Sequence, residues 1–230
     1  MSFSNNKLLL GAAISQIVFL LVWAVWAGVS EAVALNPFST DTIGSDVILG
    51  AVLFIPVFLV AAGISKAVMW VDSSAKVANL KQGLRFRRIF GGLSVPALAG
   101  FSCLVGFCEE LLFRGALQSQ FGIVVSVVVF VVAHVPGKNY LWAVNLVMMG
   151  TVFSMLYEHT GSLTASVVLH ALVDFVVFLG ISDENLARAF GNLSLDEQDE
   201  VEHLLPLEVF DLWVEQDEAR LEQLVQAYRG

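Results

Sequence analysis

Hydrophobic residues are grouped along this chain in long blocks that contain almost no charge. Residues 8–29, 47–65, 89–108 and 162–181 contain no Asp, Glu, Lys or Arg except Asp174. Each block has close to the ~20 residues that an α-helix needs to cross the hydrocarbon core of a bilayer. Two shorter apolar blocks cover residues 123–135 and 140–157. The pattern predicts an all-α integral membrane protein built as a bundle of about six transmembrane helices.

The composition agrees with a chain that lies mostly in lipid. Hydrophobic residues make up 57% of the chain and charged residues 14%, and the mean hydropathy is +0.77. Soluble domains usually carry about a quarter charged residues. No basic surface suited to nucleic acid is expected, because the formal net charge is −9.

Charge also predicts how the chain is oriented. Residues 76–88 contain five Lys and Arg, whereas residues 30–46 contain three acidic residues and no basic one. Cytoplasmic connections of membrane proteins are enriched in Lys and Arg. We therefore expect residues 76–88 and both termini on the cytoplasmic side of a cytoplasmic (plasma) membrane.

The last part of the chain has a different composition from the rest. Residues 1–181 contain nine basic and eight acidic residues, whereas residues 182–230 contain three basic and thirteen acidic residues. Apolar residues recur at roughly helical spacing between residues 209 and 228. We expect a membrane domain at 1–181 and an acidic cytoplasmic helical tail at 182–230, with one or two amphipathic helices packed on the membrane domain.

Several ionisable residues interrupt the later apolar blocks. Ionisable groups at membrane depth are costly and indicate function by default. Counted from the expected outer helix ends, Glu109, His134, His170 and Asp174 lie about 12–18 Å deep, near the middle of a ~30 Å hydrocarbon core. The spacing predicts a polar site inside the bundle, formed by Glu109, Glu110, Arg114, His134, His170 and Asp174.

The spacing of these residues also predicts how they pair. Glu110 and Arg114 are four residues apart, so they can form an ion pair along one helix face. That pairing leaves Glu109 to point in another direction. His170 and Asp174 have the same spacing on the last apolar block.

Three motifs occur in order: Glu109–Arg114 as EExxxR, Phe130–His134 as FxxxH and His170–Asp174 as HxxxD. Over about residues 95–181 the chain resembles the CAAX protease and bacteriocin-processing family (CPBP, also called Abi), which includes the type II CAAX prenyl endopeptidases. The resemblance implies an intramembrane endopeptidase in which Glu109 and His134 activate a water. It further implies that His170 and Asp174 stabilise the oxyanion, with Glu110, Arg114 and Phe130 as supporting residues and no cofactor.

Asp174 departs from the pattern of this family, whose better-studied members often carry Asn at that position. An amide donates hydrogen bonds, whereas an ionised carboxylate only accepts them. We therefore expect Asp174 to orient His170 and to favour its hydrogen-bond-donating form, rather than to bind the oxyanion itself.

Three other functions are compatible with the same residues. His134, His170, Glu109 and Asp174 are zinc ligands by type, so a zinc-dependent peptidase is one alternative, although the chain has no HExxH motif. A second alternative is a non-catalytic membrane adaptor or bacteriocin-immunity protein that keeps the polar cluster to organise its helices. A transporter agrees less well with the sequence, because no paired, Gly- or Pro-interrupted segments are evident. The expected partners are a peptide or membrane-protein substrate and the lipid bilayer.

Overall fold

The computed structural model describes residues 3–135, 139–206 and 208–214, and no β-strand occurs in these ranges. The all-α fold class expected from the apolar blocks is confirmed. The helices are α1 (Phe3–Val29), α2 (Ile43–Val71), α3 (Ser74–Phe90), α4 (Val95–Glu110), the π-helix η1 (Leu111–Gln118), α5 (Ser119–His134), α6 (Tyr140–Thr160), α7 (Thr164–Leu179), α8 (Asp183–Gly191), α9 (Leu195–Val201) and the short 3₁₀-helix η2 (Glu202–Leu204).

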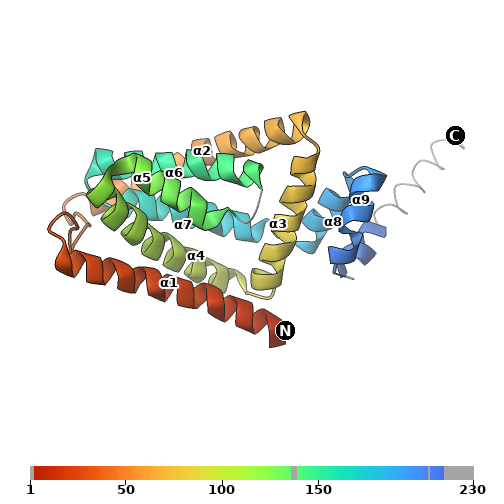
Figure 1. Cartoon of the computed structure of the whole chain (residues 1–230), viewed down its shortest axis with the longest axis horizontal. Helices are drawn as coiled ribbons and strands as arrows, with labels where there is room; N and C mark the ends of the chain where they lie inside the picture. The colour runs from red at the N-terminus through yellow and green to blue at the C-terminus, as the bar shows by residue number, and fades with distance from the viewer. Residues whose placement is uncertain (1–2, 136–138, 207, 215–230) are drawn as a thin grey trace, which may run out of the picture.

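The apolar helices run along the long axis of the molecule, and α3 crosses one end of their bundle (Figure 1). Helix α7 packs most extensively on α4 and α2. Two glycines permit this close packing. A Cβ added at Gly106 would lie 3.0 Å from the backbone nitrogen of Ala171, and one at Gly50 would lie 2.5 Å from the carbonyl oxygen of Ala165. The helix that carries His170 is therefore held at close range between two neighbours.

The chain reverses direction at Gly122. This residue has φ 82° and ψ 173°, a backbone conformation that is essentially restricted to glycine. Residues on either side of the reversal meet: the Phe113 and Phe130 rings are 5.1 Å apart, and the Ser126 hydroxyl donates to the Phe113 carbonyl at 2.6 Å. The segment 95–134 is thus a helical hairpin and not one long rod.

Fewer helices qualify as membrane spans by length and composition than the six that the sequence pattern predicts. Within the described ranges, four helices qualify, or five if α7 and α8, bent by 71°, form one broken span. The chain is a multi-pass membrane protein on this count. The difference has a simple cause, because the α5 arm after Gly122 and the 16-residue α7 are both shorter than the ~20 residues of a full crossing. The four-helix count also takes 95–134 as one helix.

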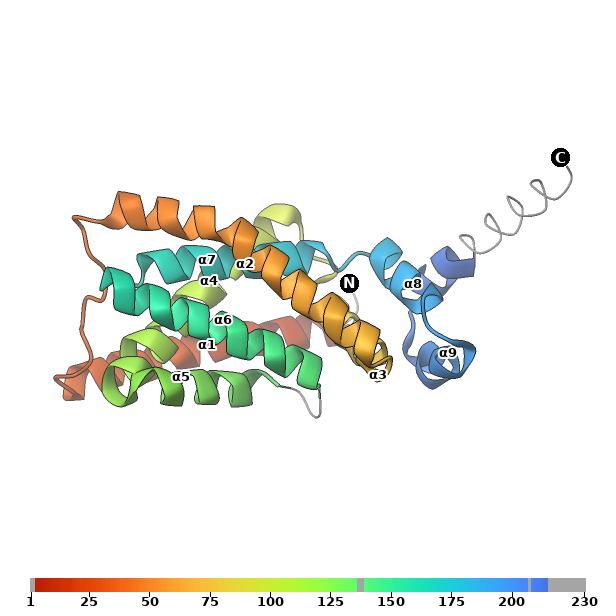
Figure 2. The same cartoon turned by 90° about the horizontal axis from the view of Figure 1, so that it is seen from above.

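Residues 76–88, treated as a connection in the sequence analysis, lie in an amphipathic helix. One face of α3 buries Val77, Leu80 and Leu84 against Leu186, Ala187, Phe190 and other apolar residues of the segment that follows α7. Helices α8 and α9 lie on the far side of α3 from the bundle (Figure 2). The apolar tail residues beyond position 214, namely Leu221, Leu224, Val225 and Tyr228, lie outside the described residues.

Opposite charges also join α3 to the acidic segment. Lys81 contacts Glu200 at 2.6 Å, and Arg87 forms two hydrogen bonds with the Asp183 carboxylate, one of them at 2.9 Å. These hydrogen bonds from Arg87 hold the pKa of the Asp183 carboxyl below its ordinary value. The acidic segment is therefore docked on a basic helix by charge as well as by apolar contact.

Substitution Gly106→Ala tests the close crossing of α4 and α7. The new Cβ would press on the backbone of α7 at Ala171 and Val167, and overpacking of this kind costs about 1–3 kcal/mol. We expect a lower melting temperature of the purified protein in detergent. Gly100→Ala is the matched control, because a Cβ at Gly100 on the same helix meets nothing within 4 Å. Equal melting temperatures for the two variants would contradict the close crossing.

Candidate active site

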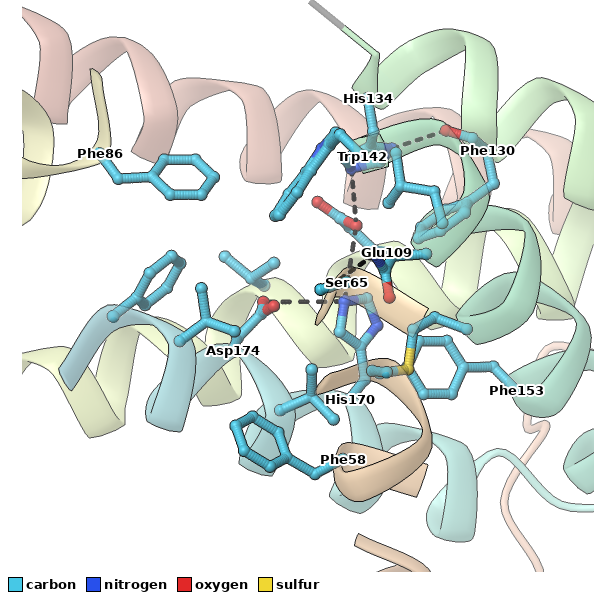
Figure 3. A pocket seen from close by; sticks show the side chains of 18 of the residues that line it. Phe58, Ser65, Phe86, Glu109, Phe130, His134, Trp142, Phe153, His170 and Asp174 are labelled. Carbon is cyan, nitrogen blue, oxygen red and sulfur yellow. Dashed lines mark hydrogen bonds and ion pairs between the residues drawn. The ribbon is translucent and has the colours of Figure 1, made fainter. Parts of the chain in front are cut away.

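The predicted site residues come together between α4, η1, α5 and α7. In Figure 3, Glu109 lies between His134 on one side and His170 on the other, with Asp174 beside His170. Glu109 and His134 are 25 positions apart in sequence, so a straight helix would separate them by about 37 Å. The reversal at Gly122 instead places the two side chains in contact.

Glu109 and His134 share a hydrogen bond that requires one proton. His134 Nε2 lies 3.1 Å from Glu109 Oε2, and His134 Nδ1 lies 2.8 Å from the Phe130 carbonyl oxygen. Because a carbonyl only accepts, Nδ1 carries a hydrogen and donates it. A hydrogen bond between Nε2 and the carboxyl then needs a further proton on one of the two groups. The pair is therefore built to hold and pass one proton.

Glu110 connects His170 to a buried cation. Its Oε1 atom accepts from Arg114 Nη1 at 2.8 Å and lies 2.8 Å from His170 Nδ1. Both Glu110 and Arg114 are fully buried. Since the Glu110 carboxylate accepts, His170 Nδ1 donates to it, and this bond fixes which ring nitrogen faces the site.

Arg114 is held by backbone and aromatic partners as well as by Glu110. Its Nη2 donates to the Gly150 carbonyl of α6 at 3.1 Å, and its guanidinium lies 4.7 Å from the centre of the Phe130 ring and 5.2 Å from that of Phe153. Such cation–π contacts are strengthened where water is excluded. Arg114 thus joins η1 to α5 and α6 immediately behind the site.

The π-helix η1 begins directly after Glu110. Wide helical turns of this kind are rare and often occur at functional sites. Side chains satisfy carbonyls in this stretch: Ser126 donates to Phe113, and Ser119 donates to Arg114 at 3.3 Å. The sequence spacing gave no indication of this irregularity.

His170 Nε2 and Asp174 face each other without a direct hydrogen bond. Nε2 lies 3.7 Å from Asp174 Oδ2 and 3.9 Å from Glu109 Oε2. These separations exceed ordinary hydrogen-bonding distances, so a water or a substrate oxygen between the groups is the arrangement to consider. His170 is also stacked on Phe153, with ring centres 4.7 Å apart. Glu110, rather than Asp174, therefore makes the closest contact that orients the His170 ring.

A cavity of about 370 Å³ opens beside these residues. Glu109, His134, His170 and Asp174 all line it, and most of the remaining wall is apolar. Phe86 and Phe90 of α3 and Trp142 of α6 contribute to the wall. A cavity of this size with a few convergent polar groups is typical of a ligand site. The cavity thus leaves room for a substrate beside the polar residues, and helices of the membrane domain surround it.

Other polar residues of the membrane helices have separate roles. Asn145 joins α6 to α2 through a hydrogen bond from its amide nitrogen to Ser65 at 3.0 Å. Glu158 accepts from Gln118 at 3.1 Å at the far end of α6. Gln16 of α1 is not among the residues predicted from the sequence, because its side-chain amide is not ionisable. Its side chain lies beside Glu109 and lines the cavity. The sequence feature that could have indicated Gln16 is a polar side-chain amide within the first apolar block.

Comparison with known proteins agrees with the geometry. Residues 91–176 match the family described as type II CAAX prenyl endopeptidase Rce1-like. Over these residues the chain is similar to that family. The match contains all three motifs, and the resemblance inferred from them is confirmed.

A curated relative is the uncharacterized protein YpbD of Bacillus subtilis (strain 168), with 33% identity over 106 residues. The alignment covers 44% of this chain and 54% of YpbD, so the chain spans about half the length of that relative. No solved structure matches the chain. Helices α1–α3 and the segment after α7 lie outside the residues that match the Rce1-like family.

The zinc-dependent alternative depends on how the candidate ligand atoms are arranged. Among the described residues, no group of three or more His, Cys, Asp and Glu side chains is placed to hold a metal ion. The atoms of Glu109 and His134 that would bind zinc face each other at 3.1 Å, while His170 Nδ1 is bonded to Glu110. Glu109 Oε2 and His134 Nε2 are thus used in a hydrogen bond with each other, and the zinc-dependent alternative stays a hypothesis.

Removing Arg114 should destabilise the protein strongly. Arg114→Met would leave the Glu110 carboxylate buried without its cationic partner, and loss of one member of a buried pair costs about 3–5 kcal/mol. We expect a large fall in melting temperature, partly reversed in the double variant Glu110→Gln/Arg114→Met. Arg88→Met, at an exposed position of α3, is the control. A melting temperature for Arg114→Met equal to that control would show that the buried pair adds no stability.

Proposed function

We propose that this protein is an intramembrane endopeptidase that hydrolyses a peptide bond with a water activated by Glu109 and His134. The observation that carries the proposal is the Glu109–His134 contact at 3.1 Å on the wall of a cavity enclosed by membrane helices. The Rce1-like match supports the reaction class, because the family is described as an endopeptidase.

In the proposed first step, the oxygen of a water attacks the carbonyl carbon of the peptide bond. Glu109 takes one proton from that water, and the π electrons of the carbonyl move to its oxygen, which becomes an oxyanion. In the second step the oxyanion re-forms the carbonyl, the C–N bond breaks, and the Glu109–His134 pair gives the proton to the leaving nitrogen. A positioned base and its conjugate acid accelerate both steps.

His170 is the proposed donor to the oxyanion. Its Nδ1 is fixed by Glu110 at 2.8 Å, which leaves Nε2 facing the cavity. Preorganised donors in a site that excludes water stabilise developing charge effectively. Arg114 acts behind Glu110. The carboxylate of Asp174, 3.7 Å from Nε2, favours the charged, donating form of His170 through its negative charge.

The proposed substrate is a peptide or a membrane protein that enters the cavity from the bilayer or from the end covered by α3. The cavity wall is largely apolar, which suits a segment already in contact with lipid. We propose that this end of the bundle lies on the cytoplasmic side, because α3 contains five basic residues and cytoplasmic connections are enriched in Lys and Arg. Both termini are then cytoplasmic in a plasma membrane.

A non-catalytic adaptor or immunity role is the second candidate. It is favoured by the extent to which the polar residues bond to one another, because Arg114, Glu110 and His170 join η1, α4 and α7. On that reading the cluster serves only to hold the helices together.

The first test compares membranes that contain the wild-type protein with membranes that contain Glu109→Gln at equal abundance. Mass spectrometry of newly formed peptide termini should find termini that depend on Glu109, because an amide cannot accept the proton from water. Glu184→Gln, at an exposed position of α8, is the matched control and should behave as wild type. Identical termini in all three samples, with each protein folded, would favour the adaptor role. Loss of cleavage on strong chelation would favour the zinc-dependent alternative.

Asp174→Asn tests the role of the carboxylate beside His170. If the negative charge of Asp174 favours the donating form of His170, an uncharged amide should be a poor replacement. Removal of a whole oxyanion donor costs about 10²- to 10³-fold in kcat, so weakening the donor His170 should cost less. We expect Asp174→Asn to lower kcat by about 10- to 100-fold, close to the effect of Asp174→Ala, with an unchanged melting temperature. Activity equal to or above wild type would show instead that an amide-type donor is tolerated or preferred here.

A further inference from the structure

Gln16 lies on α1, outside the residues that match the Rce1-like family. Neighbouring positions on the same helix, including Ile14, Ile17 and Val18, are exposed large hydrophobic residues on the surface that would face lipid. Gln16 is only 5% exposed and points inward. A side-chain amide is therefore buried in the membrane domain at the level of Glu109.

The hydrogen-bonding capacity of this amide is largely unused. Gln16 Nε2 has two long contacts, to Glu109 Oε1 and Ser15 Oγ, each at 3.5 Å. Its Oε1 atom has no hydrogen-bond partner. Side-chain amides can link membrane helices by hydrogen bonds, but such a link requires a well-formed partner. Since unpaired buried polar groups are rare and costly, this amide requires another explanation.

The position of Gln16 relative to the reacting groups supplies that explanation. Glu109 uses Oε2 toward His134 and His170, whereas its Oε1 faces Gln16. Gln16 lines the same cavity as these three residues. A peptide bond offers one carbonyl acceptor and one N–H donor, and the Gln16 amide has one complementary group for each.

A comparison of the nitrogen donors near Glu109 also indicates a role for Gln16. Among the described residues, the contacts of the Glu109 carboxylate involve three side-chain nitrogens: His134 Nε2 at 3.1 Å, Gln16 Nε2 at 3.5 Å and His170 Nε2 at 3.9 Å. His134 is committed to sharing a proton with Glu109. An ionised Asp174 has no hydrogen to donate. Of the donors that contact Glu109, His170 and Gln16 are therefore the two left for a substrate oxygen.

We propose that Gln16 is a catalytic residue that binds the attacked peptide group, with its Nε2–H donating to the carbonyl oxygen and strengthening that bond as the oxyanion forms. In this role α1 supplies the amide donor that the carboxylate of Asp174 does not. The inference rests on the proposed peptidase function, and it assigns a direct role in the reaction to a helix outside the matched domain.

The test uses the purified full-length protein and a peptide that spans the cleavage site found by the comparison of termini. Gln16→Met keeps a similar length and removes every donor and acceptor, whereas Gln16→Asn keeps a shorter amide. Loss of one oxyanion donor costs about 10²- to 10³-fold in kcat. We expect that loss for Gln16→Met, a smaller loss for Gln16→Asn, and little change in KM or melting temperature.

Gln82→Met is the matched control. Gln82 is also buried, at 7% exposure, and its Oε1 is also unpaired, but it lies on α3 and does not line the cavity. A kcat for Gln16→Met equal to that of Gln82→Met would overturn the role of Gln16 while leaving the peptidase function in place. Absence of cleavage by the wild-type protein, with Glu109→Gln indistinguishable from it, would overturn the function and this inference together.

Discussion

The ion pair between Glu110 and Arg114 is the interaction on which the rest of the site depends. A charge in the hydrocarbon region requires a partner, and here one carboxylate oxygen serves Arg114 and His170 together. Arg114 in turn bonds to α6 and lies against aromatic rings of α5 and α6. The pair therefore holds four helical segments together, namely α4, η1, α6 and α7. The Glu109–His134 contact forms within this frame.

Two features of the backbone make this frame possible. The turn at Gly122 brings α5 back along η1, so that residues far apart in sequence share one level of the bundle. The small residue at Gly106, one turn before Glu109, lets α4 approach the backbone of α7 next to His170. Neither feature involves a polar group, yet both determine whether the polar groups meet.

The sequence predicts which polar residues lie together better than it predicts the path of the chain. Glu109, His134, His170 and Asp174 are identifiable because ionisable residues rarely occur in apolar helices, and three short motifs specify their order. The π-helix, the amphipathic α3 and the sharing of Glu110 between two partners are not predictable in this way. They depend on contacts between helices, which spacing within one helix does not report. Gln16 is not predicted for a different reason. An uncharged amide in a long apolar block is also typical of a residue that only packs between helices.

Helix α3 makes contacts in two different parts of the structure. Val77, Leu80 and Leu84 belong to the core that holds the acidic segment, whereas Asn79, Phe86 and Phe90 form part of the cavity wall. Helix α3 alone therefore separates the acidic segment from the cavity beside Glu109. Any shift of α3 therefore changes both the surface that holds the acidic segment and the wall of the cavity, so the two cannot vary independently.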